Sequence, residues 1–167
     1  MHVSRKQAAG ILGLLIAVVA VDQLVKGLVV RALADGGSRS LVPGLLDLSY
    51  RQNPGVAFSA LPHAGPYLLI ALNIVVLAMF VALTWRHMRG RRERIALALV
   101  CGGAIGNMLD RIRLHYVIDY LDFHVGRYHW PVFNIADASI VIGVGLLLLS
   151  FLAANHSPVP PPEGDRP

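Results

Sequence analysis

The chain has 167 residues, of which 55% are hydrophobic and only 15% are charged. Soluble domains carry about 25% charged residues, so this composition excludes a soluble enzyme and a disordered chain. A single cysteine, Cys101, excludes a disulfide-stabilised secreted module. One domain is expected at this length, and the composition indicates a small integral membrane protein.

Four apolar stretches reach the roughly 20 residues that a helix needs to cross a bilayer. They are Ile11–Val30, Pro66–Trp85, Ile95–Leu114 and Ile135–Ala154. We therefore predict four transmembrane helices in a single domain covering residues 1–156. The remaining segment, Ser157–Pro167, contains five prolines and no apolar periodicity, which predicts a disordered cytoplasmic tail.

The first stretch has a second interpretation as a cleaved signal peptide, because small residues at Ala32 and Ala34 resemble a signal peptidase site. Its apolar region is longer than the 7–15 residues usual for such a peptide. It also carries Asp22 and Lys26 near its far end. Both features favour a retained transmembrane helix.

Basic residues are concentrated on one side of the predicted helices. Five arginines lie in the short link between the second and third stretches: Arg86, Arg89, Arg91, Arg92 and Arg94. Arg5 and Lys6 precede the first stretch, whereas the two longer links contain few basic residues. Basic loops stay in the cytoplasm, so both termini are predicted to be cytoplasmic. The net charge of +5 reflects this topology, and no nucleic-acid partner is expected.

Polar and ionisable residues of the predicted helices gather near the outer boundary of the membrane. Such groups cost about 2.5–3.5 kcal/mol each at a helix centre and by default indicate function. The set comprises Asp22, Lys26, Asn107, Asp110, Arg111, Asn134 and Asp137, with Asp119 in the adjoining outer link. This gathering on one side predicts a site there.

Several of these residues also have structural interpretations. Asp22 and Lys26 are spaced i, i+4 and can neutralise each other, so pairing and a direct role in the site both stay open. The small residues Gly102 and Gly106 favour close helix packing. Asn107 and its polar neighbours could form a clasp between helices or support a site.

Asp119 and Asp137 flank a link that must return to the membrane, so their carboxylates can meet at one depth. Two carboxylates at one site do not easily both ionise, so one holds a proton while the other activates a water. Such a pair hydrolyses peptide bonds without a metal or a nucleophilic side chain. The spacing therefore suggests an aspartic hydrolase.

Competing chemistries have less support. No H-E-x-x-H motif occurs, and no metal or other cofactor is expected. A Ser–Lys pair of Ser59 and Lys26 is conceivable. A small transporter or proton-conducting protein, built on the same buried charges, is the strongest alternative from another class. It requires a polar path to the cytoplasm, whereas the inner halves of the second and fourth stretches are nearly free of polar residues.

Five ordered motifs carry a resemblance that covers about residues 11–154. They are Asp22-Gln23-x-x-Lys26, Asn53-Pro54-Gly55-Val56-Ala57-Phe58, Gly102-Gly103-Ala104-Ile105-Gly106-Asn107-Met108-Leu109-Asp110-Arg111, Val117-Ile118-Asp119-Tyr120 and Phe133-Asn134-Ile135-Ala136-Asp137. This set resembles the lipoprotein signal peptidase (signal peptidase II) family. The resemblance implies an all-α membrane protein, a four-helix bacterial inner-membrane aspartic protease with a small periplasmic β-cradle. Its implied reaction removes signal peptides from prolipoproteins just before a diacylglyceryl-modified cysteine.

By the same resemblance, Asp119 and Asp137 form the catalytic pair, near the periplasmic face. The positions that line or brace the site are Asn53, Gly103, Asn107, Asp110, Arg111 and Asn134, with Asp22 and Lys26 as structural or supporting residues. Tyr120 replaces a frequent phenylalanine, which we expect to matter little. Diacylglyceryl-prolipoproteins, membrane lipid and the inhibitor globomycin are the implied partners, and a monomer is expected.

Two segments of the outer links partly alternate apolar and polar residues. They are Leu45–Asn53 and Val117–Val125. Alternation with a period of two predicts short strands, which would form such a cradle.

Overall fold

The computed structural model describes residues 4–55, 66–87 and 90–155. Its long helices are α1 (Arg5–Leu33), α3 (Pro66–His87), α4 (Arg91–Leu114) and α5 (Ile135–Asn155). All four are long and apolar enough to cross a membrane, which confirms the four predicted stretches. The predicted tail, Ser157–Pro167, lies outside the described residues.

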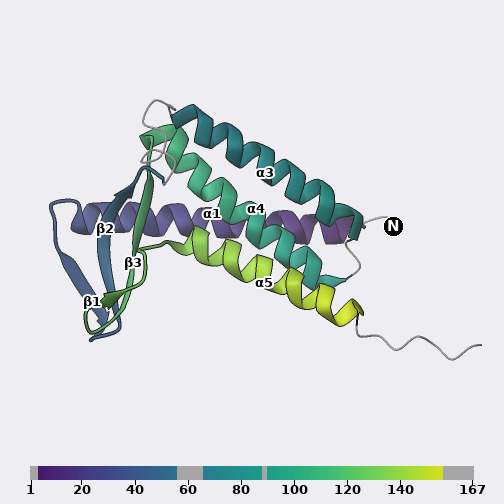
Figure 1. Cartoon of the computed structure of the whole chain (residues 1–167). Coiled ribbons are helices and arrows are strands. Elements are labelled where there is room, and N and C mark those ends of the chain that lie inside the picture. Colours follow the sequence, from purple (N-terminus) through teal and green to yellow (C-terminus); the bar gives the residue numbers. More distant parts are fainter. Residues whose placement is uncertain (1–3, 56–65, 88–89, 156–167) are drawn as a thin grey trace, which may run out of the picture.

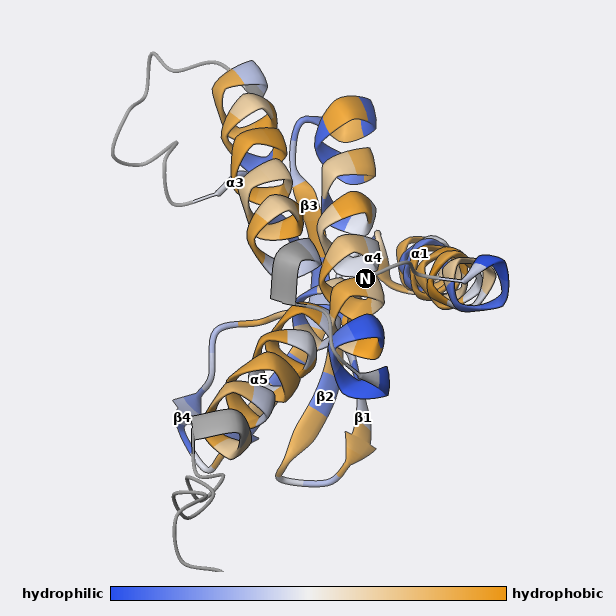
Figure 2. Cartoon of the chain, turned by 90° about the vertical axis from the view of Figure 1, so that its right-hand side faces the viewer, coloured by the Kyte–Doolittle hydropathy of each residue, from blue (hydrophilic) through white to orange (hydrophobic). Residues whose placement is uncertain are grey.

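Helix α1 begins with a capping box. The Ser4 hydroxyl accepts a hydrogen bond from the Gln7 backbone, and the Gln7 side chain accepts one from the Ser4 backbone. Further along, α1 buries Asp22 and Lys26 and exposes large apolar side chains such as Leu24. This arrangement reverses that of a soluble helix and suits a helix surrounded by lipid. The hydropathy colouring in Figure 2 shows that apolar residues make up most of the long helices.

Helix α4 is the centre of the bundle and contacts the other three helices. Small residues allow this close approach. A Cβ atom added at Gly102 would lie 2.8 Å from Val18 Cβ, and one added at Gly103 would collide with the Ala136 carbonyl oxygen. The predicted packing role of the Gly102 to Gly106 motif is therefore confirmed.

In the described part of the chain, four antiparallel strands form a sheet in the order β1-β2-β3-β4. They are β1 (Ser38–Val42), β2 (Leu46–Asn53), β3 (Val117–Val125) and β4 (Tyr128–His129). The two predicted strands are confirmed as β2 and β3, while β1 and β4 are additional. The sheet lies at one end of the bundle, opposite the end where α1 begins (Figure 1).

An apolar cluster fastens the sheet to the helices. Val29 and Leu33 at the end of α1 pack with Ile118 and Tyr120 of β3. The Tyr120 hydroxyl also accepts a hydrogen bond from the backbone of Ile135, where α5 begins, at 3.2 Å. Phenylalanine could not make this contact, so Tyr120 adds a hydrogen bond between β3 and α5. The hydrogen bond from Ile135 to Tyr120 fixes the start of α5 relative to β3.

Candidate active site

Asp119 lies on β3 beneath the sheet and is only 3% exposed. Two side-chain amides donate to its carboxylate, one to each oxygen. Asn53, at the end of β2, donates to Oδ2 at 2.7 Å, and Asn134 donates to Oδ1 at 2.7 Å. Strand pairing brings Asn53 close, because β2 and β3 are neighbours in the sheet.

Asp137 lies in the first turn of α5. Its Oδ1 accepts a hydrogen bond from Asn107 Nδ2 at 2.7 Å, and its Oδ2 accepts one from the Asn134 backbone at 3.2 Å. In return, the Asp137 backbone donates to Asn134 Oδ1 at 2.9 Å. These reciprocal bonds at a helix start fix the carboxylate relative to Asn134. Asn134 therefore contacts both aspartates.

The environment of Asp119 favours its protonated form. Burial, the largest cause, and the nearby charge of Asp137 together raise the pKa of Asp119 to about 6. Hydrogen bonds from Asn53 and Asn134 and the charge of Lys26 oppose this rise. A carboxyl group with a pKa near neutrality can hold or release a proton under physiological conditions, as acid–base catalysis requires.

A buried ion cluster lies next to the two aspartates and is joined to Asp137 through Asn107. Lys26, 1% exposed, donates to Asp22 Oδ2 and Asp110 Oδ2, both at 2.8 Å, and to Asn107 Oδ1 at 2.9 Å. An ammonium group has three hydrogens, and all of them are used here. The predicted pairing of Asp22 with Lys26 is confirmed, with Asp110 as an additional partner.

This cluster determines how Asn107 is oriented. An ammonium group only donates, so the oxygen of the Asn107 amide must face Lys26. Its nitrogen is then directed to Asp137. Lys26 thus reaches the aspartate pair through Asn107, without touching either carboxylate of the pair.

Three further hydrogen bonds join α1 to the site. The Asp22 Oδ1 accepts a hydrogen bond from the Ala136 backbone, next to Asp137, at 3.0 Å. Gln23 donates to Asp110 Oδ1 at 2.9 Å and to the Gly106 carbonyl at 3.2 Å. Gln23 is not among the residues predicted for the site. Its position as a polar residue inside a predicted membrane helix is the signal that could have identified it.

A mostly apolar groove of about 390 Å³ runs between α3, α4 and α5. Its lining includes Leu72, Phe80, Ile140 and, as polar members, Asn73 and Arg111. Arg111 Nε and Asn73 Oδ1 are buried and have no hydrogen-bond partner among the described residues. The groove therefore offers apolar walls together with polar atoms that a bound molecule could satisfy.

The family is established by comparison with known sequences. A family model described as signal peptidase (SPase) II matches residues 14–153. The chain belongs to the signal peptidase II family.

Relatives support this membership over most of the chain. A lipoprotein signal peptidase of Syntrophotalea carbinolica is 45% identical over 140 residues, covering 80% of this chain and 84% of that protein. One from Cupriavidus taiwanensis is 44% identical over 138 residues, covering 81% and 78%. A solved bacterial membrane enzyme structure has a TM-score of 0.75 at 26% identity, covering 91% of this chain and 95% of that one. The signal peptidase II fold, helices with a small sheet, is therefore confirmed.

The residues predicted for a signal peptidase II site divide into three groups in the structure. Asn53, Asn107 and Asn134 contact the aspartates directly. The second group stands behind them and consists of Asp22, Lys26 and Asp110. Arg111 lines the groove, and Gly103 packs against Ala136, the neighbour of Asp137. Ser59, the alternative nucleophile, lies outside the described residues.

Proposed function

We propose that this protein is an aspartic endopeptidase that removes signal peptides from diacylglyceryl-modified prolipoproteins, with Asp119 and Asp137 as the catalytic pair. One observation carries the proposal: two carboxylates from separate elements converge on a single residue, Asn134, at one end of a membrane helix bundle. Family membership supports the protease activity and the lipoprotein substrate. The aspartic mechanism rests on the geometry of the pair.

The proposed reaction starts with one proton on the pair. Asp119 holds it, because its pKa is raised to about 6 and substrate binding would exclude more water. Asp137, whose carboxylate accepts hydrogen bonds from Asn107 and the Asn134 backbone, acts as the base. It takes a proton from a water whose oxygen bonds to the scissile carbonyl carbon, while Asp119 protonates the carbonyl oxygen.

The tetrahedral intermediate then collapses. Asp137 passes its proton to the departing amine as the carbon–nitrogen bond breaks, and Asp119 recovers a proton from the intermediate's hydroxyl group. The products are a signal peptide with a new carboxyl end and a protein whose amino-terminal cysteine carries the lipid. The pair returns to its starting state, and each proton transfer in the proposed reaction is carried by Asp119, Asp137, water or substrate.

The groove between α3, α4 and α5 suits the apolar part of this substrate. Its walls are mostly aliphatic and aromatic, as a lipid chain or an apolar signal peptide requires. Arg111, whose Nε has no partner among the described residues, could donate to a peptide carbonyl there. Globomycin, as a peptide inhibitor of the family, would compete for this region.

We further propose that the protein is a monomer of the bacterial inner membrane, with both termini in the cytoplasm. The aspartate pair would then lie near the periplasmic face. In support, the start of α4 with Arg91, Arg92 and Arg94 is at the opposite end of the bundle from the sheet (Figure 1).

The alternative of a transporter or proton-conducting protein is not favoured. Beyond family membership, a conducting path would need polar groups along the length of the bundle. In the first half of α4, the buried residues are apolar: Ala96, Leu97, Ala98 and Val100. The polar cluster, by contrast, lies near the sheet.

The test uses Asp122 as a matched control. Asp122 is on the same strand, but its carboxylate pairs with His129 at 2.7 Å instead of joining the site. With purified, folded protein and a diacylglyceryl-modified substrate, Asp119→Asn and Asp137→Asn should each lower kcat by about 10⁴-fold. Asp122→Asn should keep most activity, and the double Asp119/Asp137 variant should be no worse than either single variant. Substantial turnover by either single variant would refute the aspartic mechanism.

A further inference from the structure

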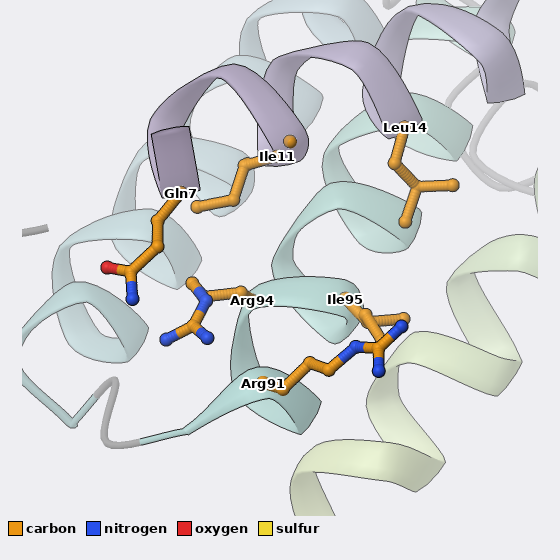
Figure 3. A pocket seen from close by; sticks show the side chains of 7 residues that line it. Gln7, Ile11, Leu14, Arg91, Arg94 and Ile95 are labelled. Atoms are coloured by element: carbon orange, nitrogen blue, oxygen red, sulfur yellow. The ribbon is translucent and has the colours of Figure 1, made fainter. Parts of the chain in front are cut away.

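A second cavity lies at the end of the bundle opposite the aspartate pair, between the beginnings of α1 and α4. It measures about 400 Å³ and is lined by Gln7, Gly10, Ile11, Leu14, Arg91, Arg94 and Ile95. Figure 3 shows that Arg94 extends toward Gln7, while Arg91 runs alongside Ile95. None of these residues takes part in the proposed reaction.

Within the described part of the chain, the lining of this cavity includes two arginines and no acidic side chain. Among the described residues, no acidic side chain forms an ion pair with Arg91 or Arg94. Glu93 is between them in sequence and shares a second cavity with Arg91, but its carboxylate forms no ion pair with either arginine. The guanidinium groups of Arg91 and Arg94, spaced i, i+3 on one face of α4, are therefore available to bind an anion.

The cavity also has an apolar part. From Gln7, the lining of α1 continues to Ile11 and Leu14, one and two turns further into the membrane helix. On α4, Ile95 follows Arg91 by one turn. Gly10 leaves space in this wall, because a Cβ atom placed there would have no neighbour within 4 Å. A polar, cationic entrance followed by an apolar lining matches a negatively charged amphiphile rather than a free anion.

We propose that this cavity binds the headgroup of an anionic glycerophospholipid from the leaflet on the side of the amino terminus. Arg91 and Arg94 hold the phosphate, and the Gln7 amide donates to a headgroup oxygen. The first acyl carbons lie against Ile11, Leu14 and Ile95. Such a lipid would tie α1 to α4 at one end, as Lys26 ties them at the other.

The test measures binding of single lipids to the purified full chain in detergent, by native mass spectrometry with phosphatidylglycerol and phosphatidylcholine as probes. The wild type should retain phosphatidylglycerol preferentially. The double variant Arg91→Gln/Arg94→Gln should weaken that binding by about 30-fold, because each basic residue near an anionic headgroup contributes about fivefold. The control Arg5→Gln/Arg92→Gln removes the same charge outside the cavity lining and should have a much smaller effect. Equal losses in the two double variants would overturn the proposal.

A second variant removes no charge. Gly10→Leu places a side chain in the open part of the cavity and should lower phosphatidylglycerol binding while the protein stays folded, as judged by an unchanged Tm without lipid. Undiminished binding in this variant would contradict the proposed position. Inorganic phosphate serves as a further probe: it should neither displace phosphatidylglycerol nor raise the Tm at millimolar concentration. If phosphate alone reproduces the lipid's effect, the site is one for free anions and the proposal fails.

Discussion

Asn134 donates a hydrogen bond from its side-chain amide to Asp119 Oδ1 at 2.7 Å, and it is itself completely buried. The oxygen of the same amide accepts the backbone N–H of Asp137. One asparagine thereby sets the distance between strand β3 and helix α5 at the point where each carries a carboxylate. The relative position of the two carboxylates therefore depends on this side chain.

Replacing this asparagine should impair the reaction without unfolding the protein. Asn134→Ala removes the amide donor to the Asp119 carboxylate and the acceptor for the Asp137 backbone N–H. We expect kcat to fall by about 100-fold, as for a misplacement of about 1 Å. The loss of a donor to the Asp119 anion should also raise the pKa of Asp119 above 6 and shift the pH profile upward. Gln52→Ala, an exposed amide next to Asn53, is the control and should retain activity. An unshifted profile in Asn134→Ala would argue against this role.

The ion cluster should respond unequally to loss of its members. Lys26→Met leaves Asp22 and Asp110 buried without their cation, and we expect a loss of about 3–5 kcal/mol in the free energy of unfolding. Asp22→Asn should cost less, because Lys26 keeps Asp110 and the new amide oxygen can still accept from Ala136. Removing all three charges together should recover part of the loss. Thermal unfolding in detergent measures these differences, with the exposed Lys6→Met as control.

Stability should depend on pH through Asp119. The pKa of this group is about 6 in the folded protein and about 4 in an unfolded chain. The folded state therefore holds the proton more tightly, so the stabilisation is complete below pH 4 and is lost as pH rises through 6. The Tm of the wild type, relative to Asp119→Asn, should fall between pH 4 and 7 and stay level above. A difference that does not change with pH would contradict the raised pKa.

Close packing of α4 on α5 should matter for activity. A methyl group at Gly103 would collide with the Ala136 carbonyl, so Gly103→Ala should push the start of α5 away from α4 and displace Asp137. We expect a loss of about 1–3 kcal/mol in stability and reduced kcat. Gly27→Ala adds the same methyl group in a membrane helix where nothing lies within 4 Å. Equal behaviour of the two variants, in Tm and turnover, would show that the contact is unimportant.

The orientation can be tested with reporter fusions. A reporter fused after Gly90 should read as cytoplasmic, because it follows the first basic residues of the Arg86–Arg94 link. One inserted near Gly37, before β1, should read as periplasmic. The opposite pattern would put the aspartate pair on the wrong side for processing exported proteins.

The helices and the two long strands could be predicted because their signals are local. Twenty apolar residues or an alternating segment indicate an element without reference to the rest of the chain. Strand β1 gives no such signal, since all five of its residues are exposed. Strand β4 has only two residues, Tyr128 and His129, too few for any periodicity.

The residues of the candidate site could be predicted from the sequence, but the contacts between them could not. Intramembrane charge pointed to Asp22, Lys26 and Asp110, and the i, i+4 spacing identified one pair. The second partner of Lys26 is 84 positions away in the chain, and only the packing of α1 on α4 brings it close. Likewise, Gly103 was predicted to line or brace the site, and its contact with Ala136, next to Asp137, depends on how closely two helices approach.

The hydrogen bond from Ala136 to Asp22 joins positions 114 residues apart. A ribosome and translocon deliver the first helix long before the last, so for most of its synthesis the chain has neither Asp119 nor Asp137. When α5 is inserted, the backbone N–H of Ala136 in its first turn must reach the Asp22 carboxylate of α1, which is already in the membrane. Under the proposed mechanism, a partly inserted chain therefore cannot cleave peptides, because the helix that carries Asp137 is made last.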